Sequence, residues 1–363
     1  MNVFARMRRW SPGIVVPMLM LILLGLCFVY STTAAGTASK FFIRQILWSC
    51  LGLAIFVFCA NVRYKSFLFR AGLLYAMFNV LLITVLFFGK SKGISKSWLA
   101  LGPFTMQPSE FAKLTIVLIL ARYLGSKPSG TSGYRLIGGG LALAFLPVLL
   151  VLAQPDIGTA IVFGPIVLTM LWVGGAKAKQ ILVLLLAGCL VLPIAFFQLK
   201  EYQRDRLLVF LNPDRDPLGA GYNIIQSKIA IGSGGFQGKG FGKGTQNRLK
   251  FLPEKHTDFI FSILGEEFGW WGGMLVLLLF FTMLAHALRI ARSTSDMQGK
   301  LLVVGLATLI FCHVFINISV SLGVMPATGL PLPFVSYGGS SLVTCMAATA
   351  LIVNVGSRRF HFL

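Results

Sequence analysis

The sequence predicts an all-α polytopic membrane protein of about ten transmembrane helices, with both termini cytoplasmic and one large extracytoplasmic loop. Of its 363 residues, 56% are hydrophobic and only 12% are charged, whereas soluble domains carry about 25% charged residues. Apolar stretches of about 20 residues recur along the chain, and each suits a hydrocarbon core about 30 Å thick. The third observation is an unequal distribution of Lys and Arg between alternate loops, which predicts the orientation.

The expected membrane spans follow the apolar stretches in chain order. They cover residues 13–32, 44–61, 67–89, 107–124, 136–153, 157–174, 180–198, 259–288, 301–322 and 340–357. No convincing small-residue cleavage site follows the first stretch, so we expect a retained helix rather than a removed signal peptide. We expect a single domain over residues 1–363, with 199–258 as its large outer loop.

The basic residues favour one orientation over its inverse. With the N-terminus inside, the cytoplasmic segments hold fifteen Lys and Arg residues and the short outer loops hold five, which is the usual bias. The segment 199–258 is left out of this comparison because long loops translocate largely regardless of charge. The net charge of +21 is therefore typical of cytoplasmic loops beside anionic lipid and does not indicate nucleic-acid binding.

The loop 199–258 is the most polar part of the chain and holds six of its eleven Asp and Glu residues. Ile224, Ile225, Ile229 and Ile231 within it predict a short helix resting on the membrane surface. Residues 232–244 contain seven glycines but fit neither a Walker motif nor a GxGxxG motif. This glycine-rich segment predicts either a mobile flap over a substrate or a flexible connector.

A few ionisable residues fall inside or beside the apolar stretches, where they are costly. Glu110 and Lys113 share one helix face, which predicts either a structural ion pair or the polar floor of a cavity open to the outer side. Asp156 at a helix start is typical of capping, although it could also orient a cation. His313 is more typical of a hydrogen-bonded core residue than of a proton relay.

Asp258 ends the polar loop where the eighth span begins. Phe259 and Phe261 could desolvate its carboxylate and raise its pKa towards the range of a general base. The same residue, like Thr257, would also suit the N-cap of the following helix. The spacing alone leaves both interpretations open.

Residues 329–341 are rich in Pro and Gly and favour irregular backbone. At membrane depth such backbone must be buried in protein or line a cavity. The segment therefore predicts a wall of the site without indicating a ligand.

Five stretches of the chain together resemble the SEDS family of cell-wall polymerases. They are QPSEFAK at 107–113, QPDIGTA at 154–160, NPDRDPLGAGYNIIQSKIAIGSGG at 212–235, PEKHTDFIFSILGEEFG at 253–269 and GLPLPFVSYGGSS at 329–341. The resemblance covers about residues 13–357, and the stretch beginning GYNIIQ is more similar to the elongation branch, RodA, than to the division branch, FtsW. It implies a peptidoglycan glycosyltransferase that polymerises lipid II at the outer face of the bacterial cytoplasmic (inner) membrane.

The resemblance also implies roles for particular residues. Asp258, the acid of the HTDFIF stretch, matches the essential catalytic residue of the family. Glu110, Lys113 and Asp156 match structural or channel polar positions. The predicted substrate-binding residues are Arg44, Lys96, Arg206, Gln226, Lys228, Ser336 and Tyr337.

The chain departs from the family pattern in the second outer loop. Many members have Arg directly before the Trp of this loop, whereas this chain reads Lys96-Ser97-Trp98. If that Arg binds pyrophosphate, Lys96 must substitute for it from an adjacent position.

The implied chemistry converts an α-linked pyrophosphate donor into a β-1,4 linkage, which requires inversion in a single displacement. Asp258 would deprotonate the acceptor hydroxyl, and positive charge would stabilise the departing pyrophosphate. Arg206 and Lys228, with Arg44, suit phosphate oxygens. A divalent cation, Mg²⁺ or Mn²⁺, could share that task, although no ligand cluster in the sequence indicates a metal site.

The implied partners are lipid II, the nascent glycan strand, a class B penicillin-binding protein transpeptidase and other elongation-complex membrane proteins. Two other functions compete with the polymerase. A lipid II flippase would fit broken helices and charges at the membrane midplane, but it has no need of a carboxylate on an outer loop. A scaffold for the transpeptidase is compatible with an enzyme, and a division-type polymerase is the remaining alternative.

Overall fold

The computed structural model describes residues 10–33, 38–92, 95–101, 104–128, 130–198, 201–212, 216, 221–249, 251 and 256–358. The long helices are α2 (Pro12–Thr33), α3 (Ala38–Asn61), α5 (Ala71–Phe88), α6 (Pro108–Gly125), α7 (Gly133–Ala153), α8 (Ile157–Val173), α9 (Ala178–Gln198), α13 (Ile260–Ser293), α14 (Met297–Ser321) and α15 (Gly339–Arg358). The shorter helices are α4 (Tyr64–Phe69), α10 (Glu201–Leu211), α11 (Tyr222–Gly234) and α12 (Thr245–Arg248).

The ten long helices coincide with the ten predicted spans to within a few residues. Within the described residues, seven of them, α2, α3, α5, α7, α13, α14 and α15, are long and apolar enough to cross a membrane. Shorter apolar stretches occupy α8 and the first part of α9, and α6 contains Glu110, Lys113 and Arg122. The predicted fold class, a multi-pass all-α membrane protein, is confirmed.

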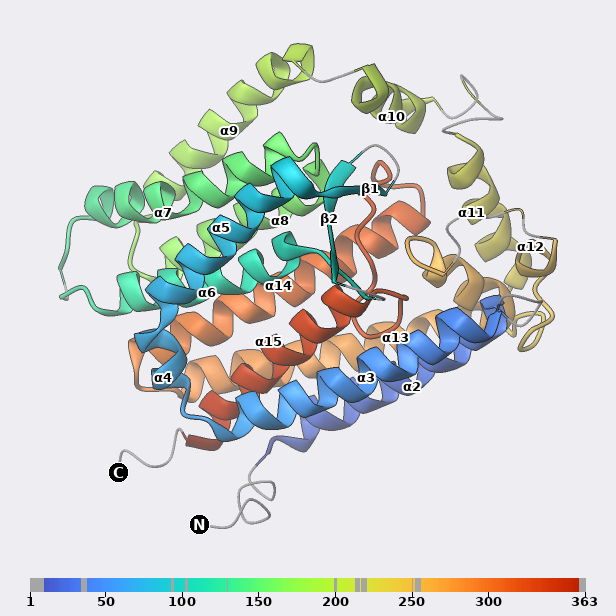
Figure 1. The fold of residues 1–363 in the computed structure, drawn as a ribbon, viewed down its shortest axis with the longest axis horizontal. Coiled ribbons are helices and arrows are strands. Elements are labelled where there is room, and N and C mark those ends of the chain that lie inside the picture. The colour runs from blue at the N-terminus through green and yellow to red at the C-terminus, as the bar shows by residue number, and fades with distance from the viewer. Residues whose placement is uncertain are drawn as a thin grey trace.

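The predicted outer loop before α6 contains three strands, which the hydropathy pattern did not predict. Strands β1 (Lys90–Lys92), β2 (Ser95–Leu101) and β3 (Phe104–Met106) form an antiparallel sheet in the order β1-β2-β3. In Figure 1 these strands lie at the same end of the helices as α11 and α12. The start of α2 and the end of α15 lie at the opposite end, as an even number of spans requires.

Helix α15 lies at the centre of the molecule, and every residue from Gly339 to Val355 in it is buried. Small residues allow neighbouring helices to approach it closely. A Cβ on Gly339 would lie 2.1 Å from the Trp48 ring of α3, and one on Gly52 would lie 2.2 Å from the sulfur of Met346. The position of α3 against α15 therefore depends on these glycines.

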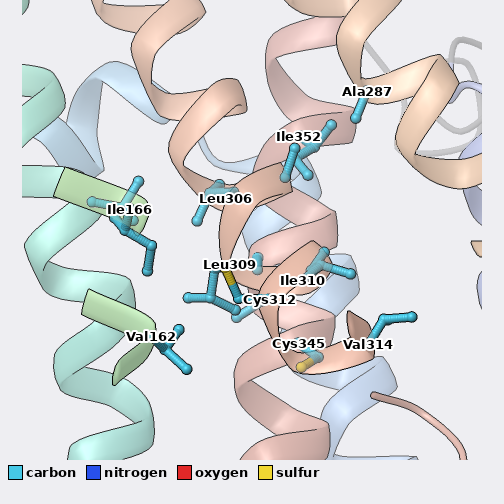
Figure 2. Packing of buried hydrophobic residues seen from close by; sticks show 14 of the residues in the cluster. Val162, Ile166, Ala287, Leu306, Leu309, Ile310, Cys312, Val314, Cys345 and Ile352 are labelled. Carbon is cyan, nitrogen blue, oxygen red and sulfur yellow. The ribbon is translucent and has the colours of Figure 1, made fainter. Parts of the chain in front are cut away.

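Apolar side chains fill the space between α8, α13, α14 and α15. Figure 2 shows Val162 and Ile166 of α8 facing α14 at Leu306 and Leu309. In the same view Ile352 of α15 lies towards α13. Van der Waals packing of this kind is what holds helices together in a membrane, where lipid tails are as apolar as the side chains.

Helix α11 is the short helix predicted in the large loop, and its inner face packs on protein. The hydroxyl of Ser227 lies 2.6 Å from that of Ser262 on α13 and donates to the carbonyl of Ser321 on α14 at 2.6 Å. A Cβ on Gly234 would lie 2.0 Å from the Gly265 carbonyl oxygen. Ile229 on its other face is 47% exposed.

Candidate active site

The segment that connects α14 to α15, residues 322–338, has the irregular backbone that its prolines and glycines predict. Leu330, Leu332, Phe334, Val335 and Ser336 in it are all buried. Helix α2 packs directly against its backbone, because a Cβ on Gly25 would lie 2.5 Å from the Phe334 carbonyl oxygen. Irregular backbone at this depth is thus enclosed by protein, as expected.

Asp258 lies beside this connecting segment, in a turn formed by residues 256–259. Phe259 takes the N-cap position of α13 and makes no side-chain cap. The capping interpretation, which required Asp258 or Thr257 at that position, is therefore wrong. The Asp258 side chain is partly exposed, and a Cβ on Gly329 would lie 3.8 Å from its Oδ2. Phe259 and Phe261 are buried in the core.

Three successive carbonyl groups of this turn accept hydrogen bonds from distant parts of the chain. The Tyr337 N–H donates to the His256 oxygen at 2.9 Å, and the Ser336 hydroxyl donates to the Thr257 oxygen at 2.6 Å. The Asn317 amide donates to the Asp258 oxygen at 3.0 Å. The backbone that positions Asp258 is therefore fixed by α14 and by the connecting segment.

Two of the predicted pyrophosphate partners contact the same segment. The Nη1 of Arg206, on α10, donates to the Ala327 carbonyl oxygen at 3.4 Å. The Lys228 side chain, on α11, lies over Gly323, where a Cβ would come within 2.9 Å of its Nζ. Both side chains are exposed, so their charges remain available to an anionic ligand.

Arg44 lies near Tyr337, at the end of the connecting segment. Burial raises the pKa of the Tyr337 phenol although the nearby Arg44 charge opposes that shift. Tyr337 therefore stays protonated at neutral pH. Its ring centroid lies 5.2 Å from that of Phe41 and 5.7 Å from that of His256, and Phe41 and His256 are 5.0 Å apart.

The structure gives the positions of two more predicted substrate-binding residues, Gln226 and Lys96. Gln226 lies on α11 and is partly exposed. Lys96 pairs with Ser91 between β1 and β2, and its side chain is outside the described residues. Their contribution to binding stays a prediction.

Three ionisable residues of the spans form one buried network. Lys113 Nζ lies 2.7 Å from Glu110 Oε1 and 2.7 Å from His313 Nε2, and all three side chains are buried. The ion pair and the hydrogen-bonded core histidine thus both form. The polar floor of a cavity stays a prediction.

Asp156 is the N-cap of α8 and also connects two other helices. Its carboxylate accepts from the Thr159 N–H at 3.1 Å and the Thr159 hydroxyl at 2.9 Å, as the capping interpretation predicts. It accepts a third hydrogen bond, at 2.9 Å, from the Gln107 amide. The Gln107 N–H in turn donates to Ser340 on α15 at 3.0 Å.

Sequence reasoning missed Asn317, which contacts the backbone of Asp258. It is an amide inside an apolar span, and buried polar residues in such spans usually have a partner. That signal could have identified Asn317 as a residue with a specific role, but not its partner.

Residues 12–360 match the FtsW/RodA/SpoVE family, which is described as "Cell cycle protein". The chain belongs to this family. Among its curated members, the chain is 40% identical to the peptidoglycan glycosyltransferase MrdB of Escherichia coli, over 96% of this chain and 95% of that protein. It is 34% identical to the peptidoglycan glycosyltransferase RodA of Treponema pallidum, over 94% and 96% of the two chains.

Solved structures of family members have the same fold. One belongs to a peptidoglycan synthase complex that coordinates polymerization and crosslinking, with 32% identity, coverage of 97% and 98%, and a TM-score of 0.82. Another is the rod shape determining protein RodA of Thermus thermophilus, with 29% identity, coverage of 97% and 98%, and a TM-score of 0.73. The family resemblance of the sequence is therefore confirmed.

Proposed function

We propose that this chain is a peptidoglycan glycosyltransferase that polymerises lipid II into β-1,4 glycan strands during cell elongation. One observation supports this most directly. Asp258, Arg44, Arg206 and Lys228 come from four different parts of the chain. Asp258 lies beside Gly329 of the connecting segment 322–338, and the three basic residues lie against Tyr337, Ala327 and Gly323 of the same segment. A carboxylate and several cations arranged along one segment supply the base and the positive charge that an inverting displacement of pyrophosphate requires.

In this reaction Asp258 acts as the general base. It accepts the proton of the acceptor sugar hydroxyl while that oxygen attacks the anomeric carbon of the donor and the bond to pyrophosphate breaks. Arg206, Lys228 and Arg44 stabilise the negative charge that develops on the departing pyrophosphate. The Tyr337 hydroxyl, which is protonated at neutral pH, is a further donor beside Arg44.

A divalent cation at the pyrophosphate stays a proposal. Within the described part of the chain, no three His, Cys, Asp or Glu side chains gather closely enough to hold a metal ion. A cation would therefore need substrate phosphate oxygens among its ligands, as Mg²⁺ commonly has.

The proposed location is the bacterial cytoplasmic membrane, with the site on the outer face. The excess of Lys and Arg in the loops at the other end of the helices supports this orientation. The proposed partners are a class B penicillin-binding protein transpeptidase and other elongation-complex proteins. The similarity to a synthase complex that couples polymerization with crosslinking supports the first of these.

The test is polymerisation of lipid II by the purified complex with and without Asp258→Asn. The substitution removes the base and keeps the shape of the side chain, so we expect at least about a 100-fold loss of rate. Binding of lipid II should persist. Wild-type activity in this variant would overturn the choice of Asp258 as base. A folded wild-type protein that makes no polymer, with its transpeptidase partner present, would overturn the proposed enzymatic activity.

A further inference from the structure

Asn317 lies on α14, one helical turn after His313, and only 1% of it is exposed. Its Nδ2 donates to two carbonyl groups, that of Asp258 at 3.0 Å and that of Leu330 at 2.8 Å. The first acceptor lies in the turn before α13, and the second lies in the connecting segment after α14. One amide therefore joins the two backbone segments between which Asp258 is placed.

We infer that Asn317 is a positioning residue for the Asp258 carboxylate. This inference rests on the proposed function, in which Asp258 is the base. Asn317 holds the carbonyl of Asp258 itself, so loss of this bond would free the backbone of the turn that carries the carboxylate. Tyr337 and Ser336 donate hydrogen bonds to the two preceding carbonyls, those of His256 and Thr257. Asn317 donates to the third, that of Asp258.

The chemistry of the contact requires an asparagine-like donor. Both partners are carbonyl oxygens, so the side chain must present its NH₂ group to them and cannot be turned over. Oδ1 is buried and has no hydrogen-bond partner among the described residues. An aspartate or an aliphatic residue of similar size would leave both carbonyls without this donor.

The chain offers a control at the opposite end of the helices, an asparagine that makes more hydrogen bonds than Asn317 does. Asn354 on α15 is also buried, and its Nδ2 donates to the carbonyls of Cys59 at 2.7 Å and Ala60 at 3.0 Å. Replacing either asparagine removes one amide that holds two or more carbonyl oxygens. Only Asn317 is connected to the turn of Asp258.

The experiment compares Asn317→Leu and Asn354→Leu in the full-length protein, purified with its transpeptidase partner. Thermal unfolding and the rate of lipid II polymerisation are measured over a range of lipid II concentrations. We expect both variants to lower the Tm, because each leaves buried carbonyls unpaired. We expect only Asn317→Leu to lower kcat, by roughly 100-fold, since a misplacement of about 1 Å has this effect.

KM separates positioning from a general loss of structure. It should stay within about threefold of wild type in Asn317→Leu, because the lost interaction acts in the transition state. Equal losses of kcat in the two variants, or a loss confined to KM, would overturn the inference. If Asn317→Leu does not fold, the pair Asn317→Ser and Asn354→Ser repeats the comparison with a smaller, uncharged side chain that cannot bridge both carbonyls.

Failure of this inference can be told from failure of the proposed function. If Asp258→Asn abolishes polymerisation while Asn317→Leu keeps the wild-type kcat, only the positioning role is wrong. If Asp258→Asn keeps the wild-type rate, the base is wrong, and the positioning role fails with it.

Discussion

The Lys113 ammonium is a charged group that is costly to bury. It is fully buried within α6 and lies between Glu110 and His313, at 2.7 Å from each. Burying two opposite charges is costly even when they pair, whereas removing one partner leaves an uncompensated charge, which costs more. The pair therefore adds little net stability compared with apolar residues. Removing only one of its two partners, however, destabilises the protein strongly.

This asymmetry predicts the behaviour of Lys113→Met. The variant leaves the Glu110 carboxylate buried without its cation, so we expect a loss of about 3–5 kcal/mol of stability. The double variant Glu110→Gln with Lys113→Met should regain most of it. Thermal unfolding in detergent measures both, and a double variant no more stable than Lys113→Met would contradict the argument.

Polymerisation by the double variant separates the two interpretations of this pair. A structural ion pair predicts that activity returns together with stability. A polar floor that contacts substrate predicts a stable protein whose rate stays low.

At the scale of the elements, the break in α13 explains the glycine-rich segment. Gly269 interrupts the helix with φ 64°, and the backbone of residues 235–240 replaces the missing helical hydrogen bonds. The Lys239 N–H donates to the Glu266 oxygen at 3.0 Å, and the Trp270 N–H donates to the Gly235 oxygen at 2.9 Å. A Lys239–Glu266 ion pair at 2.8 Å also joins this segment to α13.

The glycines of this segment are thus needed for close backbone approach. Neither the mobile flap nor the flexible connector expected from the composition describes these hydrogen bonds. The composition could not distinguish a flexible segment from a closely packed one, because glycine permits both.

Two glycines of the segment allow a matched test of this docking. Gly238 and Gly242 both have positive φ, 76° and 66°, so Ala at either should cost about 1–2 kcal/mol of strain. Only at Gly238 would the new Cβ collide, 2.2 Å from the Glu267 carbonyl oxygen, while Gly242 has open space. Gly238→Ala should therefore release the segment from α13, and Gly242→Ala should not.

Limited trypsin digestion measures this release, since Lys239 and Lys243 lie within the segment. We expect faster cleavage in Gly238→Ala than in Gly242→Ala or wild type. Equal cleavage rates in the two variants would show that the close contact does not hold the segment in place.

At the scale of the whole molecule, the arrangement of the helices separates two unlike ends. The end with β1, β2, α11 and α12 also holds the segment that connects α14 to α15 (Figure 1), and Asp258 lies beside this segment at Gly329. The other end has the first turn of α2 and the last turn of α15. The distribution of Lys and Arg predicts that this second end is cytoplasmic.

Labelling of single cysteines tests this orientation. Lys243→Cys and Lys177→Cys replace exposed lysines at the two ends, in a variant whose six native cysteines are changed to alanine. A membrane-impermeant maleimide applied to intact spheroplasts should label Lys243→Cys, and Lys177→Cys should react only after permeabilisation. The reverse pattern would place Asp258 on the cytoplasmic side and contradict the proposed reaction at the outer face.

The sequence alone determined the ten helices, because apolar stretches of membrane-spanning length have few other stable forms. Its motifs determined the family and predicted Asp258 as the catalytic base. Local patterns also predicted the Glu110–Lys113 pair and the cap at Asp156, since each depends on residues within one helical turn.

Only the tertiary structure decided which distant residues meet. It placed Arg44, Arg206 and Lys228 against one connecting segment, and it joined Asn317 to Asp258, 59 residues earlier in the chain. It also showed residues 235–240 completing the broken helix α13. These contacts depend on how the helices pack around α15, and periodicity within one helix reports the faces it buries but not the partner that covers them.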